Sequence, residues 1–378
     1  ALTVIAPIDG TPASRAGLQA GDLIEKIDGE ETMRLTVQEC VRRLKGEKGT
    51  KVTITIRRPG DEGPFDVTLV RDEIPTFSIP LAHMIRPGVG FVRISNFTST
   101  TATELDADIR KLREQGMTRL LLDLRRNPGG LLEQAVQVAE RFVPAGTMIV
   151  YTRGRVPGSH QDYFAATEVD RVTEPLVVLV DHASASASEI VSGAIQDHDR
   201  GLVVGETTFG KGLVQRVIPL RGGGAVALTT AQYFTPSGRL IQRDYSDLED
   251  YFLGAGEEDE EEAPPEVDRS DSEIRRTDSG RVVYGGGGIT PDYVVRAQRA
   301  SSYVSRLIRE NLLFDFSVRW SQAHPGLEPD FQVDAPLLEE LERYLEERGV
   351  PVGEPFEADR PVISMRLRAQ IQPKAPWT

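Results

Sequence analysis

The sequence is short of the residues that build disulfides, metal sites and membrane helices. Its single cysteine, Cys40, permits no internal disulfide and no cysteine-built metal site, and it falls on an apolar helical stripe typical of a core residue. The five histidines are scattered, and none has the HxxxH or HExxH spacing of zinc enzymes. No run approaches the roughly 18 uninterrupted apolar residues that a membrane helix needs. These absences disfavour a zinc enzyme and a membrane-spanning chain.

Positive charge is also scarce. With 44 Lys and Arg against 58 Asp and Glu, the 378 residues carry a formal net charge of −14, part of it in the acidic run Glu257–Glu262. This charge repels phosphate backbones, so nucleic acid is not expected as a principal partner. The chain opens at Ala1 without a starting Met or the features of a signal peptide, and we interpret it as a processed or cut product.

Residues 1–72 predict a small β-rich domain with one main helix. The strand at 23–27 leads into Asp28-Gly29, a hairpin signal, and alternating β-branched residues predict strands at 51–57 and 65–70. Apolar residues at i, i+3, i+4 and i+7 predict a helix between them, with Thr36 placed to cap it. The residues of this stripe are Val37, Cys40, Val41 and Leu44.

Residues 73–298 predict an α/β core. Buried apolar runs at 120–124, 176–180 and 202–204 alternate with helical patterns. The strand at 90–95, a helix with Leu105, Ile109 and Leu112 on one face, and the strand at 120–124 indicate a βαβ unit. Residues 254–282 are acidic and polar and are expected to be a mobile surface excursion without catalytic residues. Residues 299–378 predict a helical tail, with Leu337, Leu338, Leu341 and Tyr344 at helix spacing.

The sharpest local pattern is the strand at 176–180, which runs into Asp-His-Ala-Ser-Ala-Ser-Ala-Ser-Glu and then into a helix. A serine at such a corner, Ser186, is exposed by the turn, and the free N–H groups of the helix N-terminus can stabilise a developing oxyanion. This geometry suits acyl transfer. The alternative is structural, because Ser186 and Glu189 also satisfy a capping box.

A nucleophilic serine needs a base. His182 and His198 are near Ser186 in sequence, but neither has a neighbouring pattern that would position it, and a surface or structural role fits each better. Lys211 lies in Phe-Gly-Lys-Gly, next to apolar segments, and a buried lysine can lose its proton and act as a base. The alternative for Lys211 is a solvated loop lysine.

The segment around Lys211 has a competing interpretation as a phosphate-binding loop. Residues 205–212 fit the pattern G-x-x-x-x-G-K, but Gly212 stands where that loop needs a Ser or Thr hydroxyl for Mg²⁺. Residues 213–219 also predict a strand where a phosphate-binding loop requires a helix N-terminus. We therefore do not expect a nucleotide site.

A third loop, Asp-Leu-Arg-Arg-Asn-Pro-Gly-Gly at 123–130, follows a buried strand and precedes a helix. Its paired glycines, Gly129 and Gly130, let a backbone N–H approach a ligand closely, as an oxyanion donor must. The alternative is a strand-to-helix turn that needs glycine only for its backbone dihedral angles.

The motifs together resemble a known family. Residues 16–30, AGLQAGDLIEKIDGE, resemble a bacterial PDZ domain, and the match covers nearly all of 1–72. DLRRNPGG, SASASEI and FGKGLVQ, in this order after it, are similar to the carboxyl-terminal processing proteases, a Ser–Lys peptidase family of bacteria and chloroplasts. The resemblance runs from residue 1 to about 298, including GGGGITPD.

The resemblance implies a serine endopeptidase that cleaves protein substrates near their C-termini through an acyl-enzyme. Ser186 would be the nucleophile, Lys211 the general base, and Gln215 the residue that orients the lysine. Ser184 and Ser188 would be turn and helix-start residues. The N–H of Ala187 and that of Gly129 or Gly130 would form the oxyanion hole. No metal, nucleotide or other cofactor is implied.

The implied fold is an α/β protease core of the crotonase/ClpP-like type, with an N-terminal, mainly β PDZ domain and a helical C-terminal tail. The PDZ domain would hold the substrate's C-terminal segment, although its first strand and carboxylate-binding loop would lie before Ala1. Further expectations are a regulatory or adaptor protein, a homodimer through the tail, and a place in the bacterial periplasm or cell envelope. The alternative function is a catalytically silent PDZ scaffold that binds C-terminal peptides or a partner protease.

Overall fold

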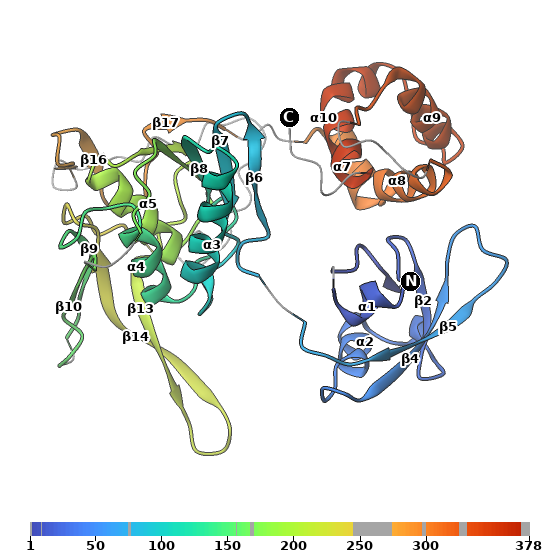
Figure 1. Cartoon of the computed structure of the whole chain (residues 1–378), viewed down its shortest axis with the longest axis horizontal. Coiled ribbons are helices and arrows are strands. Elements are labelled where there is room, and N and C mark those ends of the chain that lie inside the picture. The colour runs from blue at the N-terminus through green and yellow to red at the C-terminus, as the bar shows by residue number, and fades with distance from the viewer. Residues whose placement is uncertain are drawn as a thin grey trace. The chain divides into compact units, whose positions relative to one another are not determined.

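The protein forms two compact units in a computed structural model (Figure 1). One unit takes its residues from 1–76 and 299–377, and the other from 77–298. Buried apolar side chains gather in three separate clusters, one in the N-terminal part, one in the C-terminal part and one in the second unit. The structure describes residues 2–8, 10–74, 77–155, 157–166, 170–244, 274–296, 300–324 and 331–371.

The N-terminal part of the first unit is an antiparallel sheet with strand order β1-β2-β4-β5 and with β3 beside β2. The strands are β1 (Leu2–Thr3), β2 (Leu23–Ile27), β3 (Glu30–Glu31), β4 (Lys51–Arg57) and β5 (Phe65–Val70). The expected Asp28-Gly29 turn joins β2 to β3, and both residues have positive φ, 47° and 85°. Strands β4 and β5 have the bounds that the period-two alternation predicted.

Two α-helices accompany this sheet in the described residues, α1 (Pro12–Arg15) and α2 (Val37–Leu44). Thr36 caps α2 as predicted, because its hydroxyl accepts the Glu39 N–H (3.3 Å) while the Glu39 carboxylate accepts the Thr36 N–H (2.8 Å). Cys40 is buried, but Val37 is 68% and Val41 41% exposed. Of the predicted apolar stripe, Cys40 is therefore buried in the core, while Val37 and Val41 face away from the core.

The C-terminal part of the first unit is helical in its described residues. The helices are α7 (Ser302–Arg309), α8 (Leu312–Ala323), α9 (Ala335–Glu346) and α10 (Glu354–Ile371). Leu337, Leu338, Leu341 and Tyr344 of α9 are all buried in a cluster of their own with residues of the other three helices. Asp334 caps α9 by accepting the Leu337 N–H (3.1 Å). None of the described helices is both long enough and apolar enough to cross a bilayer.

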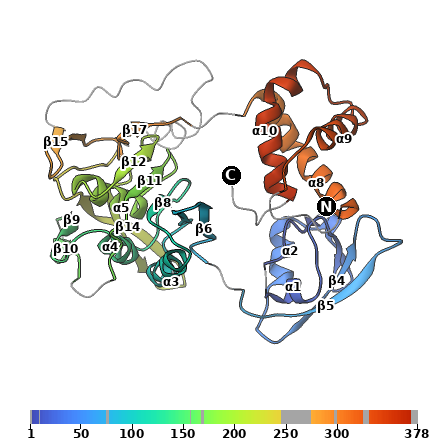
Figure 2. The same ribbon diagram turned by 45° about the horizontal axis from the view of Figure 1, so that its top comes forward.

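The second unit is built on a six-stranded sheet with the order β17-β12-β11-β8-β7-β6. All neighbouring pairs are parallel except β7 and β6, and Figure 2 shows β11, β12 and β17 as neighbours. The strands are β6 (Leu81–Arg86), β7 (Val89–Arg93), β8 (Arg119–Asp123), β11 (Leu176–Val180), β12 (Leu202–Gly205) and β17 (Tyr293–Val294). The pairing of β7 with β8 confirms the predicted βαβ unit.

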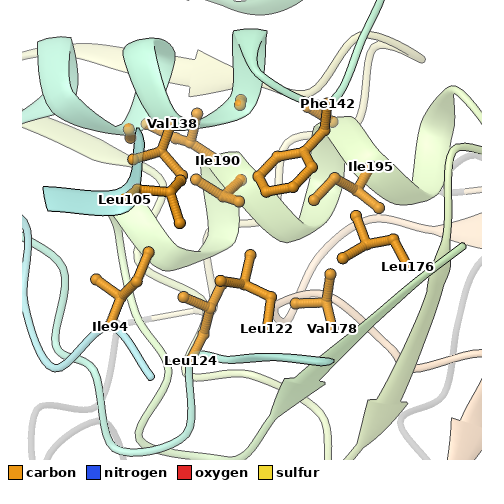
Figure 3. Close-up of a cluster of buried hydrophobic side chains, with 14 of the residues drawn as sticks. Ile94, Leu105, Leu122, Leu124, Val138, Phe142, Leu176, Val178, Ile190 and Ile195 are labelled. Carbon is orange, nitrogen blue, oxygen red and sulfur yellow. The ribbon is translucent and has the colours of Figure 1, made fainter. Parts of the chain in front are cut away.

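Three helices cover one face of this sheet: α3 (Thr101–Glu114), α4 (Leu132–Glu140) and α5 (Ala187–Asp197). Figure 3 shows the contact between the layers, with Leu122 and Val178 from the strands facing Val138 and Ile190 from the helices. These side chains are all at most 3% exposed. Their burial holds α5 firmly along the sheet, which matters because α5 carries a candidate catalytic residue at its first turn.

A second, antiparallel sheet has the order β10-β9-β14-β13. Its strands are β9 (Met148–Arg153), β10 (Gln161–Phe164), β13 (Leu213–Pro219) and β14 (Ala225–Phe234). The β13–β14 hairpin projects from the rest of the unit (Figure 1). Strand β13 confirms the expectation that a strand, and not a helix, follows Gly212.

The acidic segment 254–282 lies outside the described residues as far as position 273. Its last part is described and belongs to the fold, because β15 (Ile274–Arg276) pairs with β16 (Val282–Tyr284). The Asp278 N–H donates to the Asp197 carbonyl (2.9 Å) at the end of α5. Arg281 pairs with Asp199 (2.6 Å) and Asp292 (2.5 Å). Residues 274–282 are thus mostly exposed, as expected for a surface excursion, and these hydrogen bonds and ion pairs attach their hairpin to the fold.

Candidate active site

The three motif loops follow the carboxyl ends of adjacent parallel strands, β8, β11 and β12, and therefore meet at one edge of the sheet. Backbone hydrogen bonds join them directly. The Ala185 N–H donates to the Asn127 carbonyl (3.0 Å), and the Phe209 N–H donates to the Ser184 carbonyl (3.0 Å). The residues that the sequence singled out in separate segments thus lie in one constellation of loops.

Ser186 differs from the two serines on either side of it. Ser184 and Ser188 are fully buried, and their hydroxyls donate to the carbonyls of Leu124 (2.8 Å) and Asn127 (3.0 Å). Ser186 is partly exposed at the N-cap of α5, where its N–H donates to the Glu189 carboxylate (2.7 Å) in a capping box. Its φ of 55° and ψ of −111° are unfavourable for a residue with a side chain. Such strain is typical of functional positions.

Glu189 ties the helix start to the lysine loop. Its buried carboxylate accepts the backbone N–H groups of Ser186 (2.7 Å), Gly210 (2.7 Å) and Lys211 (2.9 Å), and the hydroxyl of Thr208 (2.6 Å). Burial raises the pKa of Glu189, while these four hydrogen bonds oppose the rise. The main chains of Ser186 and Lys211 are therefore held by a single side chain.

The side chains of the three expected catalytic residues are not joined to one another. Lys211 is half-buried, and Gln215 is exposed on β13 beside a β-bulge. Among the hydrogen bonds of the described residues, none links the side chains of Ser186, Lys211 and Gln215. The structure thus brings the main chains of Ser186 and Lys211 together and places Gln215 four residues further along the strand that leaves the site.

The glycine loop lies against the first turn of α5. A Cβ atom on Gly129 would lie 2.8 Å from the Ser186 Cβ and 2.9 Å from the Ala187 nitrogen, so only glycine fits there. The Gly129 N–H donates to the side-chain oxygen of Asn127 (2.9 Å), whose amide in turn donates to the Ile94 carbonyl (2.9 Å). The pair of glycines is needed for close approach and not only for the turn.

Comparison with known proteins agrees with this arrangement. Residues 88–247 match peptidase family S41, and residues 3–58 match the PDZ domain. The chain carries an S41 peptidase domain. The match spans all three motif loops, and with the PDZ match it confirms the resemblance on which the site residues were named.

The chain is also similar to curated proteins described as carboxyl-terminal processing proteases. The carboxy-terminal-processing protease of Bartonella bacilliformis is 43% identical over 245 residues, which cover 64% of this chain and 56% of that protein. The carboxyl-terminal-processing protease of Synechocystis sp. is 43% identical over 247 residues, 64% of this chain and 57% of that protein. The chain thus spans about half the length of these curated relatives. The solved photosystem II D1 C-terminal processing protease is 33% identical, with a TM-score of 0.38 over 62% of this chain and 64% of that one.

His182 and His198 have other partners than Ser186. His182 pairs with Glu206 (3.2 Å), and His198 lies at the opposite end of α5, where it contacts Asp278 (2.8 Å). No hydrogen bond of the described residues joins either histidine to Ser186. The Ser–His alternative therefore has no geometric support, as the sequence indicated.

Two residues of the site were not identified from the sequence, Asn127 and Tyr233. Asn127 is fully buried and organises the glycine loop through both ends of its amide. Its place between Arg-Arg and Pro-Gly-Gly was a usable signal, because a polar residue inside a glycine turn often bonds the turn backbone. Tyr233 lies on β14 and reaches the site from the second sheet. No local pattern around Tyr233 indicates this contact.

A cavity of about 720 Å³ lies at the opposite edge of the S41 sheet. It is lined by the first residues of the central strands, including Leu120, Leu176 and Leu202, and by Arg119 and Arg200. None of the motif residues borders it. The candidate active site is thus formed by loops at the carboxyl edge of the sheet and is separate from this cavity.

Proposed function

We propose that the S41 peptidase domain is a serine endopeptidase with Ser186 as nucleophile, Lys211 as general base and Gln215 as the residue that orients the lysine. The observation that carries the proposal is the conformation of Ser186. Of the three serines in the motif, it alone is partly exposed, strained in its backbone and placed at a helix N-terminus, while its neighbours use their hydroxyls to hold the turn.

The reaction proceeds in two halves. Ser186 Oγ attacks the carbonyl carbon of the scissile peptide bond, and Lys211 Nζ takes the hydroxyl proton. The tetrahedral intermediate collapses, the carbon–nitrogen bond breaks, and the lysine returns the proton to the leaving amine. Water then attacks the acyl-enzyme with the lysine again as base, which releases the new C-terminus and restores Ser186. The Gln215 amide acts on the lysine as a hydrogen-bond partner once both side chains turn inward.

The oxyanion hole is assigned to the N–H groups of Ala187 and Gly130. Ala187 is the first residue of α5, so its N–H has no partner within the helix, and the helix N-terminus favours negative charge. Among the described residues, no acceptor is bonded to the N–H of Ala187 or Gly130. Both donors are therefore available to a developing oxyanion.

Gly130 is preferred to Gly129 because of the way the glycine loop pairs. The Gly129 N–H is already taken by the Asn127 side chain. The Phe97 N–H donates to the Gly129 carbonyl (2.9 Å), and the Leu131 N–H donates to the Phe97 carbonyl (3.0 Å), which is the pattern of a parallel bridge at Gly130. In such a bridge the N–H of the central residue points away from the paired strand, so the Gly130 N–H is directed away from Phe97.

The biological setting follows from the family. We propose that the PDZ domain presents the C-terminal segments of protein substrates, that an adaptor protein or a homodimer through α7–α10 regulates access, and that the protein works in the bacterial periplasm or cell envelope. The names of the bacterial relatives and the PDZ match support this setting. A crotonase/ClpP-like arrangement of the core is part of the same proposal.

The test is peptide hydrolysis by three proteins. The parent should cleave a labelled peptide and react with a fluorophosphonate, and Ser186→Ala should lose at least about 10³-fold in kcat/KM and all labelling. Ser188→Ala is the matched control, because it removes a neighbouring hydroxyl that only holds the turn. Activity in Ser186→Ala close to that of the parent would refute the assignment. A parent that binds C-terminal peptides without cleaving them would instead support the silent PDZ scaffold.

A further inference from the structure

Tyr233 reaches the candidate active site from a different layer of the domain. It lies on β14, is 1% exposed, and its N–H donates to the Gly212 carbonyl (2.9 Å). Its hydroxyl lies within hydrogen-bond distance of the Ser186 carbonyl (3.0 Å) and of the Lys211 carbonyl. A single buried phenol therefore bridges the main chains of the two residues proposed to do the chemistry.

The Tyr233 hydroxyl has one proton to share between these two carbonyls, and the two contacts are not equivalent. The Ser186 carbonyl also accepts the N–H groups of Glu189 (2.9 Å) and Ile190 (3.1 Å), so the first turn of α5 is satisfied without the tyrosine. Among the described residues, no other donor reaches the Lys211 carbonyl. Loss of the Tyr233 hydroxyl would thus remove the hydrogen-bond donor of the Lys211 carbonyl. The first turn of α5 would keep its own hydrogen bonds.

Glu189 and Tyr233 act on complementary groups. The Glu189 carboxylate accepts the N–H groups of Ser186 and Lys211, and the Tyr233 hydroxyl donates toward their carbonyls. The Glu189 carboxylate belongs to α5, and the Tyr233 hydroxyl belongs to β14. The peptide groups on both sides of each catalytic Cα are thereby tied together, which limits how far the lysine loop can move relative to the serine.

We propose that Tyr233 is a positioning residue that sets the main chain of Lys211 against Ser186. The inference rests on the proposed function, since it concerns the geometry of that reaction. A nucleophile and base must be held in a narrow range of separations, and a displacement of about 1 Å can cost about 100-fold in rate. Tyr233 does not touch the reacting atoms, so its effect falls on turnover and not on substrate binding.

The experiment compares Tyr233→Phe with the parent in steady-state peptide hydrolysis and in the rate of fluorophosphonate labelling. The phenylalanine keeps the ring and removes only the hydroxyl. We expect kcat and the labelling rate to fall about tenfold or more, with KM within about twofold of the parent. Tyr163→Phe, which removes a hydroxyl bonded to Gln161 on β10 of the same sheet, should match the parent.

A stability control separates positioning from loss of fold. Leu112→Ala empties part of the buried core at the end of α3, far from the loops, and should destabilise the domain more than loss of one hydroxyl does. Parental kcat in Leu112→Ala with reduced kcat in Tyr233→Phe supports the proposal. Parental kcat and labelling in Tyr233→Phe, or an equal fall in Leu112→Ala, overturns it. Failure of the peptidase assignment itself is recognised separately, by turnover that survives Ser186→Ala.

Discussion

Glu189 completes a capping box with Ser186 and also binds the backbone of the lysine loop. Its two oxygens receive four donors, two each, and three of these donors are backbone N–H groups from the Ser186 and Lys211 segments. A capping glutamate at the surface would need only one such bond. Complete burial of the carboxylate therefore indicates that it holds the two loops together in addition to starting the helix.

Glu189→Gln tests this role. The amide keeps one acceptor oxygen and places an NH₂ donor where the other oxygen was, so two buried donors lose their acceptor at about 1–3 kcal/mol each. We expect a lower melting temperature and a fall in kcat, measured by thermal unfolding and peptide hydrolysis. Glu140→Gln is the control, because Glu140 is also buried and bonded to Arg141 but lies away from the loops. Equal kcat in both variants would contradict the role of Glu189.

Individual elements were predictable where a single periodicity decided them. Strands β4, β5 and β11 have the bounds that alternation or a buried apolar run predicted, and β13 appears where a helix would have supported a phosphate-binding loop. The meeting of the three loops was not predicted, because it depends on the order of β8, β11 and β12 in the sheet. The exposed half of the α2 stripe did not follow, because amphipathicity identifies a helix face without saying what covers it.

The contacts of Tyr233 and Asn127 could not be predicted from local sequence. Both depend on long-range packing, since Tyr233 reaches Lys211 only when β14 folds back beside β13, and Asn127, after β8, reaches Ile94 at the end of the neighbouring strand β7. A choice between Gly129 and Gly130 likewise needed the bridge to Phe97. The residues proposed to do the chemistry were recognisable by motif, and the residues that hold them were not.

The β15–β16 hairpin is anchored by charge, which gives its attachment a pH dependence. Partial burial favours the neutral form of Asp199, but hydrogen bonds from Ser279 and Arg281 outweigh it and lower the pKa of Asp199 from 3.8 to about 2. Because the folded-state pKa is below the unfolded one, the stabilisation is present above pH 3.8 and is lost as the pH falls through about 2.

Asp199→Asn should therefore lower the free energy of unfolding at neutral pH. In this variant the free energy of unfolding should also fall less steeply than in the parent as the pH is lowered. The measurement is denaturant unfolding at several pH values between about 5 and about 2. Asp162→Asn, which removes a carboxylate paired with Arg153 at an exposed site, should keep the parental slope. Parallel acid profiles for parent and Asp199→Asn would show that this ion pair does not anchor the hairpin.

At the scale of the whole molecule, the apolar cores are separate. Leu122 belongs to the cluster of the second unit and Leu341 to that of the C-terminal helices, and no residue is shared. We expect calorimetry to resolve more than one unfolding transition. Leu122→Ala and Leu341→Ala should each destabilise their own unit by about 2–5 kcal/mol and shift different transitions. A single transition that both substitutions lower alike would show that the units unfold together.

The second unit is one continuous segment, residues 77–298, placed between the two segments of the first. Because a ribosome delivers the chain from its N-terminus, every strand and loop of the S41 peptidase domain has been made before α7 begins at Ser302. The sheet edge that carries the three motif loops can therefore take shape on a nascent chain that still lacks its C-terminal helices. Any restraint on proteolysis that required those helices would act only after the domain it restrains had formed.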